Sequence, residues 1–155
     1  MQTPASTESS ETTATTDLVP MLTEALATLF APWVAELNLQ VVQAMPGEVK
    51  LALPVAPRHV HGGGVVCGQS LMAAADTAMV LAVMTRLGGF KPMTTVQLQT
   101  SFLRPVPGGA GGDGGAVGLT ARVLRMGRNL VFGEVHLFTP DGALAAHTTT
   151  TYALL

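Results

Sequence analysis

Apolar positions along the chain first follow a helical spacing and then the spacing of a hairpin. Between Leu18 and Trp33 they recur every three or four residues, which predicts a helix with one apolar face. We expect Asp17 to cap this helix and Pro20 to lie in its first turn. Residues 39–42 and 49–55 are rich in Val and Leu on either side of Pro46-Gly47, which predicts two strands and a turn.

A long apolar helix is expected in the middle of the chain, over residues 68–87, because Gly88-Gly89 ends the pattern. The remainder indicates four strands in a meander, at residues 94–103, 116–124, 130–139 and 144–153. Strands that follow one another across turns favour an antiparallel sheet. A helix that is apolar nearly all round must be covered on nearly all sides. The sequence therefore predicts an α+β fold, with one antiparallel sheet curled around the central helix and a further helix before it.

The chain length and the composition of its first residues indicate one folded domain behind a tail. The 155 residues suffice for a single domain, which we place at residues 17–155. Nine of residues 1–16 are Ser or Thr, so this segment buries too little apolar surface to offset its ordering entropy. We expect a disordered tail there, and its composition does not resemble a secretory signal.

Charge and hydropathy exclude some classes of partner. The net charge is −2 without a run of like charges, so nucleic acid is not expected as a partner. The most apolar stretch, residues 71–84, is shorter than the roughly 20 residues of a membrane span, so no membrane is expected. The single cysteine, Cys67, excludes an internal disulfide and fits a reducing compartment, so we expect a cytoplasmic protein. The 48% apolar residues favour a buried interface between subunits.

One acidic residue in the middle of the apolar helix is the first candidate for chemistry. Asp76 lies among Met, Ala and Val residues, where a carboxylate is costly unless it is paired or hydrated. Such a carboxylate can take a proton from water. The alternative is an Asp on a solvated strip of the helix, or one bonded to a local hydroxyl such as that of Thr77.

The start of the same helix is the second candidate. Gly68 has no side chain, and the first N–H groups of a helix have no partner within it, so an oxygen that becomes negative could bind there. The alternative is a glycine that only permits a turn. His59 and His61 precede it, but the sequence has no complete set of ligands at zinc spacing nearby, so no metal is expected. We expect one histidine to bind water or substrate instead.

The spacing of Gly68 and Asp76 has a consequence for assembly. They are eight residues apart, or about 12 Å along a helix, so one chain cannot bring this carboxylate to a carbonyl bound at its own helix start. Two such helices packed antiparallel across a two-fold axis would bring them together. We therefore expect a homo-oligomer whose site is shared between subunits.

Around these residues the sequence resembles the hotdog-fold acyl-CoA thioesterases of the phenylacetate-degradation and 4-hydroxybenzoyl-CoA type. Ala75-Asp76-Thr77-Ala78 matches the family motif around its acid. Gly68 matches the first glycine of the family's His-Gly-Gly, whereas Cys67 and Gln69 replace the histidine and the second glycine. His61 stands where the family has Asn or Gln.

The resemblance covers about residues 35–155, includes the strand end Phe102-Leu103-Arg104-Pro105, and implies an activity. That activity would be hydrolysis of a small, medium-chain or aromatic acyl-CoA, with no cofactor beyond the coenzyme A of the substrate. The Gly68 N–H would polarise the thioester carbonyl and His61 would orient water or that carbonyl. Asp76 would activate water or attack directly; the sequence does not separate the two routes.

Further residues of this sequence would then contact the substrate. Cys67 and Gln69 stand in the family's loop, and Arg104, Arg125 and Arg128 are candidates to hold the phosphates of coenzyme A. The alternative for each arginine is an ordinary charge at a strand end or turn. The family's usual state is a dimer of dimers, although the spacing argument above requires only a dimer.

Two other functions stay open at this level. A hydratase or dehydratase would use His61 and Asp76 as an acid–base pair, but the chain lacks the proline-rich approach to the helix that such enzymes show. A non-catalytic acyl-CoA sensor or scaffold is favoured by the missing histidine at Cys67. A sensor that also bound DNA is disfavoured, because no Lys or Arg precedes Lys50.

Overall fold

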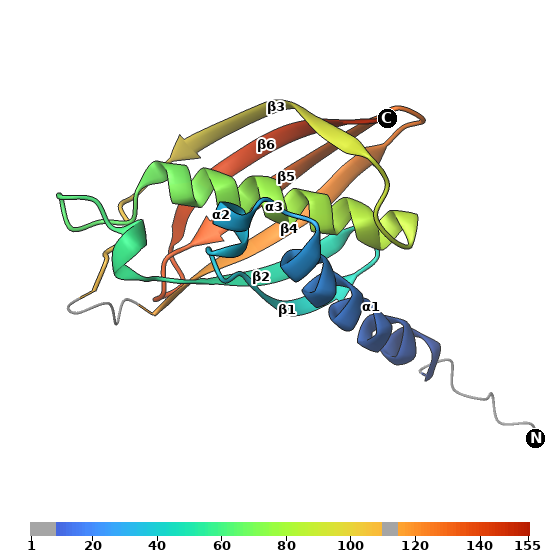
Figure 1. Cartoon of the computed structure of the whole chain (residues 1–155), viewed down its shortest axis with the longest axis horizontal. Helices are drawn as coiled ribbons and strands as arrows, with labels where there is room; N and C mark the ends of the chain where they lie inside the picture. Colours follow the sequence, from blue (N-terminus) through green and yellow to red (C-terminus); the bar gives the residue numbers. More distant parts are fainter. Residues whose placement is uncertain (1–8, 110–114) are drawn as a thin grey trace, which may run out of the picture.

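The protein is described here by a computed structural model, which covers residues 9–109 and 115–155. Its elements follow in the order α1 (Ser9–Thr28), α2 (Pro32–Ala35), β1 (Gln40–Met45), β2 (Glu48–Pro54), the 3-10 helix η1 (Pro57–His59), α3 (Gly68–Leu87), β3 (Met93–Phe102), β4 (Ala116–Met126), β5 (Leu130–Phe138) and β6 (Leu144–Leu154). The strands form one antiparallel sheet that curls around α3 (Figure 1), which confirms the predicted architecture.

The central helix α3 has the predicted bounds, and its small side chains let the sheet approach closely. It ends where Gly88 adopts the left-handed conformation (φ 75°), which costs glycine little. In β5, a Cβ on Gly133 would overlap the Met79 side chain of α3 and lie 2.9 Å from the carbonyl oxygen of Arg122, so glycine lets strand and helix pack closely here. Length and composition alone would let α3 cross a membrane, but burial among the strands accounts for the same apolar composition.

The order of the strands corrects the expected meander. β4, β5 and β6 do pair in sequence, but β3 pairs with β6, and the strand order is β1-β2-β4-β5-β6-β3. After β3, which lies at one edge of the sheet, the chain crosses to the other half of the same sheet. There β4 pairs with β2. Val66 donates its N–H to the carbonyl of Val106 (2.9 Å), which fixes this connection to the loop before α3. All six strands of the curled sheet contact α3.

The N-terminal helix begins earlier than expected. α1 starts at Ser9 rather than near Asp17, so residues 9–16 of the expected tail are helical and Pro20 lies inside the helix rather than in its first turn. No Gly or Pro lies between Ser9 and Pro20, and extending a helix costs less than starting one. Residues 1–8 lie outside the described residues, so their disorder stays a prediction.

Candidate active site

Asp76 lies on the side of α3 that faces β3 and β6, where two hydroxyl groups hold its carboxylate. Thr95 of β3 donates its hydroxyl to Oδ1 of Asp76 at 3.0 Å, and the Tyr152 hydroxyl of β6 bonds the same oxygen. The Tyr152 hydroxyl also lies 2.9 Å from the main-chain oxygen of Asp76. Thr95 and Tyr152 are directly opposed in the register of β3 and β6, so strand pairing delivers both hydroxyls to one carboxylate oxygen.

The environment of Tyr152 keeps it a hydrogen-bond donor. Its side chain is only 2% exposed, and burial together with the nearby Asp76 carboxylate raises the pKa of the phenol above its ordinary value. A protonated phenol can donate to a carboxylate. Asp76 itself is half-buried, and the alternative of a bond from Thr77 does not hold, because the Thr77 hydroxyl donates to the carbonyl of Ala73 (2.8 Å).

The start of α3 presents backbone N–H groups without a side-chain cap. Cys67 occupies the N-cap position with its Sγ 3.2 Å from Oγ of Ser70, and makes no capping hydrogen bond. In the described part of the chain, the Gly68 N–H has no acceptor. A Cβ at Gly68 would lie 3.1 Å from the ring of Phe102, so a side chain there would crowd this phenylalanine.

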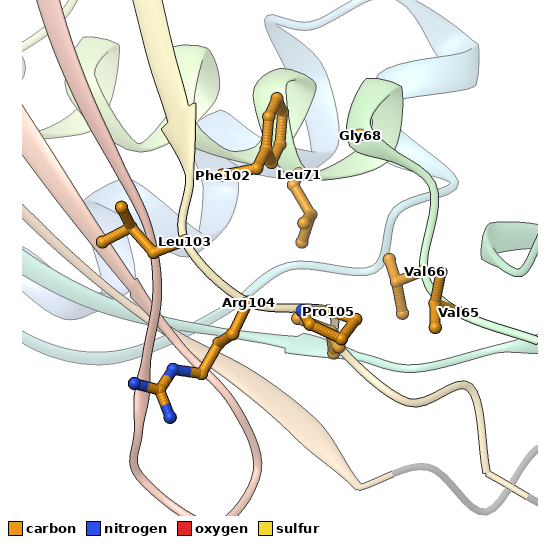
Figure 2. A pocket seen from close by; sticks show the side chains of 9 residues that line it. Val65, Val66, Gly68, Leu71, Phe102, Leu103, Arg104 and Pro105 are labelled. Atoms are coloured by element: carbon orange, nitrogen blue, oxygen red, sulfur yellow. The ribbon is translucent and has the colours of Figure 1, made fainter.

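A mostly apolar pocket of about 420 Å³ lies beside Gly68 (Figure 2). It is lined by Val65, Val66, Gly68, Leu71, Phe102, Leu103, Arg104, Pro105 and Val106. The structure thus brings the predicted Arg104 and Gly68 to one pocket. The Arg104 guanidinium points away from Gly68 in Figure 2, and its charge helps the Thr139 hydroxyl lower the pKa of Asp141.

The loop before α3 places the other predicted loop residues apart. His61 lies exposed on a turn, where its Nδ1 accepts the N–H of Gly63 at 2.9 Å. Gln69 is exposed and lines a different pocket, with Trp33 and His59. Cys67 is half-buried, and its N–H donates to the carbonyl of His59 at 2.8 Å, which closes the loop.

The predicted arginines do not form one cluster in a single chain. Arg125 and Arg128 line a shallow pocket at the turn between β4 and β5. This turn lies at the opposite end of the sheet from Phe102, because Leu130 pairs with Ala153 whereas Phe102 pairs with Ala146. Arg104 is therefore separated from the other two within one chain.

The edge strand β3 and the residue after it expose several apolar side chains, from the Asp76 side of the strand to the pocket beside Gly68. Val96, Phe102 and Leu103 are 60%, 50% and 56% exposed. β3 pairs only with β6, so its outer backbone groups face no other strand in the described chain. An exposed edge strand of this length offers unpaired N–H and C=O groups for pairing with another chain.

Comparison with known proteins identifies the family. A model of the thioesterase superfamily matches residues 59–146, which is more than half of the chain and includes α3 and the loop before it. The chain belongs to the thioesterase superfamily. Together with the sheet wrapped around α3, this confirms the predicted hotdog fold.

The relatives of this superfamily member support a hydrolase. A protein of Thermoplasma volcanium with the name "Putative esterase TV1331" is 28% identical over 108 residues, which are 70% of this chain and 76% of that protein. Among solved structures, a mutant of the phenylacetic acid degradation protein PaaI from Thermus thermophilus is 29% identical, covers 81% of this chain and 100% of that chain, and has a TM-score of 0.69. Zebra fish thioesterase superfamily member 2 is 25% identical, with coverages of 90% and 97% and a TM-score of 0.74.

Sequence reasoning missed the two hydroxyls that hold Asp76. Tyr152 is the only tyrosine of the chain and lies in a strand, which is a weak signal for a polar group inside the fold. Thr95 is one of several polar residues in β3, and nothing in the sequence separates it from the others. Their shared role depends on β3 pairing with β6, which the expected meander did not contain.

Proposed function

We propose that this member of the thioesterase superfamily hydrolyses the thioester of an acyl-coenzyme A, at a site formed jointly by two copies of the chain. The observation that carries the proposal is the half-buried Asp76 carboxylate, fixed by Tyr152 and Thr95 next to an unpaired strand edge. The comparisons support a hydrolase of esters or thioesters, and the acyl-CoA substrate is our proposal.

The hydrogen bonds to Asp76 leave one of its carboxylate oxygens available. Both hydroxyls contact Oδ1, and Oδ2 accepts no hydrogen bond from the described part of the chain. A carboxylate that is oriented through one oxygen can use the other to bind and deprotonate water. This arrangement favours a positioned base or nucleophile over an acid that merely balances a charge.

The geometry of α3 supports a site shared between subunits. Gly68 and Asp76 are about 12 Å apart along the helix, and the pocket beside Gly68 does not include Asp76. Two copies that join their β3 edges across a two-fold axis would bring the two α3 helices together in antiparallel fashion. Asp76 of one copy would then face the helix start and the apolar pocket of the other.

The reaction follows from these positions. The Gly68 N–H would polarise the thioester carbonyl and stabilise the negative oxygen of the tetrahedral intermediate. In one route Asp76 takes a proton from water as the water oxygen adds to the carbonyl carbon, the C–S bond breaks, and coenzyme A leaves as the thiol with that proton. In the other route the carboxylate attacks the carbonyl carbon, the thiolate leaves, and water hydrolyses the resulting anhydride.

Substrate contacts would come from both ends of the sheet. The apolar pocket beside Gly68 suits a small, medium-chain or aromatic acyl group, and His61 would reach the carbonyl or the water only if its turn shifts. The Arg104 guanidinium, which points away from Gly68, would contact phosphates at a distance from the acyl group. In the antiparallel pair, Arg125 and Arg128 of one copy would lie at the same end as the helix start of the other, where their charge would favour coenzyme A.

The test is thiol release from a panel of acyl-CoA substrates by the wild type and by Asp76→Asn. The amide keeps the size of the side chain but loses the basic oxygen, so we expect turnover to fall at least about 100-fold. Glu24→Gln is the matched control, because Glu24 is an exposed acid on α1, and it should keep wild-type turnover. Undiminished turnover in Asp76→Asn, or binding of every substrate by the wild type without thiol release, would overturn the proposal.

The shared site is tested by mixing two inactive chains. Asp76→Asn and Gly68→Val each damage a different half of the site, so co-expressed chains should form mixed pairs with one intact site. Random pairing would restore about a quarter of wild-type turnover. A mixture that is no more active than its two parents would show that each site belongs to one chain.

A further inference from the structure

Three side chains that can bind a metal meet on the face of the sheet opposite α3. They are Glu134 and His136 of β5 and His147 of β6, and all three are half-buried. Side chains alternate between the faces of a strand, and the buried Val135 and Leu137 face α3, so Glu134 and His136 face the other way. Figure 1 shows α3 on one side of the sheet only.

The pairing of β5 and β6 places these groups at the corners of a triangle. His136 lies directly opposite His147, and Glu134 precedes His136 by two residues on the same face. One ligand atom from each lies within 4.8 Å of the others, and Nε2 of His147 is 2.9 Å from Oε2 of Glu134. A tetrahedral ion with bonds of about 2.1 Å holds its ligand atoms about 3.4 Å apart, so small rotations of the side chains would suffice.

The surrounding charges allow a cation at this place. Arg122 of β4 lies opposite Glu134 in the strand register. The Arg122 guanidinium forms an ion pair with Glu48 at 2.8 Å, and this carboxylate offsets the positive charge of the arginine. The His136 and His147 rings lie 4.7 Å apart, and Phe138 stacks on His136 at 6.4 Å, which restricts the imidazole of His136.

We propose that Glu134, His136 and His147 bind one first-row transition-metal dication per chain, of which Zn²⁺ is the representative. Two imidazoles and one carboxylate suit this class of ion, whereas Mg²⁺ and Ca²⁺ prefer sets of oxygen ligands. A water molecule would complete the coordination on the outer side. The ion would join β5 to β6 on the face away from Asp76.

The proposed ligands lie apart from His59 and His61, the two histidines whose spacing along the sequence did not indicate a metal site. Within the described residues no group of three possible ligands includes either of those histidines. A signal was present in the hairpin, because a turn at residues 140–142 places His136 opposite His147. Strand register rather than spacing along the chain assembles the three ligands.

The first experiment measures metal binding by the full chain after chelation and dialysis. Calorimetric titration with Zn²⁺ should give one ion per chain and raise the melting temperature, whereas Mg²⁺ should do neither. Co²⁺ bound in place of Zn²⁺ should show visible absorption bands of four-coordinate geometry. Absence of Zn²⁺ binding, or binding without a defined stoichiometry, would overturn the proposal.

The second experiment removes ligands singly. Glu134→Gln keeps a hydrogen-bonding group beside His147 but removes the charge, and His136→Ala removes an imidazole. Each should weaken Zn²⁺ binding at least about tenfold. His61→Ala is the matched control, because His61 is an exposed histidine outside the cluster, and it should bind Zn²⁺ like the wild type. Circular dichroism confirms that each variant is folded, and equal Zn²⁺ binding by all three would place the ion elsewhere.

Discussion

The two edges of the sheet are built differently, although each contains a bulged and exposed valine. At one edge, β1 is six residues long and packs against α1. At the other edge, β3 is ten residues long and mostly exposed, and no helix of the described residues lies on its outer side. Val42 in β1 and Val96 in β3 both stand at register shifts, and they are 64% and 60% exposed.

The difference between the edges indicates where a second copy would join. A short strand beside a helix offers little length for pairing, whereas a long exposed edge strand offers much. The hydroxyl partners of Asp76 also lie on the β3 side, in β3 itself and in its neighbour β6. Assembly and chemistry would thus share one edge, and the other edge would serve the fold alone.

Among changes that compare the two edges, a charge on β3 is expected to have the largest effect. Val96→Lys would put an ammonium group into the proposed interface and weaken association by about 2 kcal/mol or more, or about 30-fold. Because the site needs both copies, turnover at low protein concentration should fall with the dimer. Sedimentation analysis and thiol release on the same samples measure both quantities.

The matched control is the same change at the other edge. Val42→Lys adds an equal charge to an equally exposed bulge, so it should leave both the association state and turnover at wild-type values. Dissociation by both variants would mean that charge alone disrupts the assembly. An intact and active Val96→Lys oligomer would contradict an interface at β3.

A smaller effect is expected from the hydroxyl groups on the two sides of α3. Tyr152→Phe removes one of the two hydroxyls at Asp76, a charge-assisted hydrogen bond, so turnover should fall about tenfold. On the β1 side, the Thr85 hydroxyl accepts the N–H of Gly47 at 2.8 Å in the turn between β1 and β2. Thr85→Val should therefore cost about 1–3 kcal/mol of unfolding free energy and leave kcat unchanged.

Denaturant unfolding and kcat measured on both variants separate the two roles. Loss of kcat in Thr85→Val without loss of stability would break the assignment of chemistry to the β3 side. Wild-type kcat in Tyr152→Phe would show that Thr95 alone positions the carboxylate.

Local patterns in the sequence predicted the elements well, whereas long-range pairing was harder to predict. Residues 68–87 were recognised as a helix because their apolar composition and the glycines after them are local signals. The placement of β3 beside β6 was missed, since nothing within β3 names its partner. Asp76 stood out as a lone acid among apolar residues, but Tyr152 could be assigned to it only through that pairing. Gln69 was expected at the substrate by its position in the motif, yet one helical residue after Gly68 it points to another pocket.

The smallest effect is expected from His59, which lies near Trp33 of α2 and away from the β3 edge. A change there should alter stability rather than assembly. Its side chain is 4% exposed, and burial, with a contribution from the Arg58 charge, lowers its pKa below the ordinary 6.5. The unfolded chain therefore binds a proton near pH 6.5 that the folded chain does not. The contribution of neutral His59 to stability is complete above pH 6.5 and is lost as the pH falls toward the lowered pKa.

Urea unfolding between about pH 7.5 and 5 should show a shallower loss of stability in His59→Gln than in the wild type. Parallel curves for the two proteins would mean that this histidine takes up its proton equally in both states.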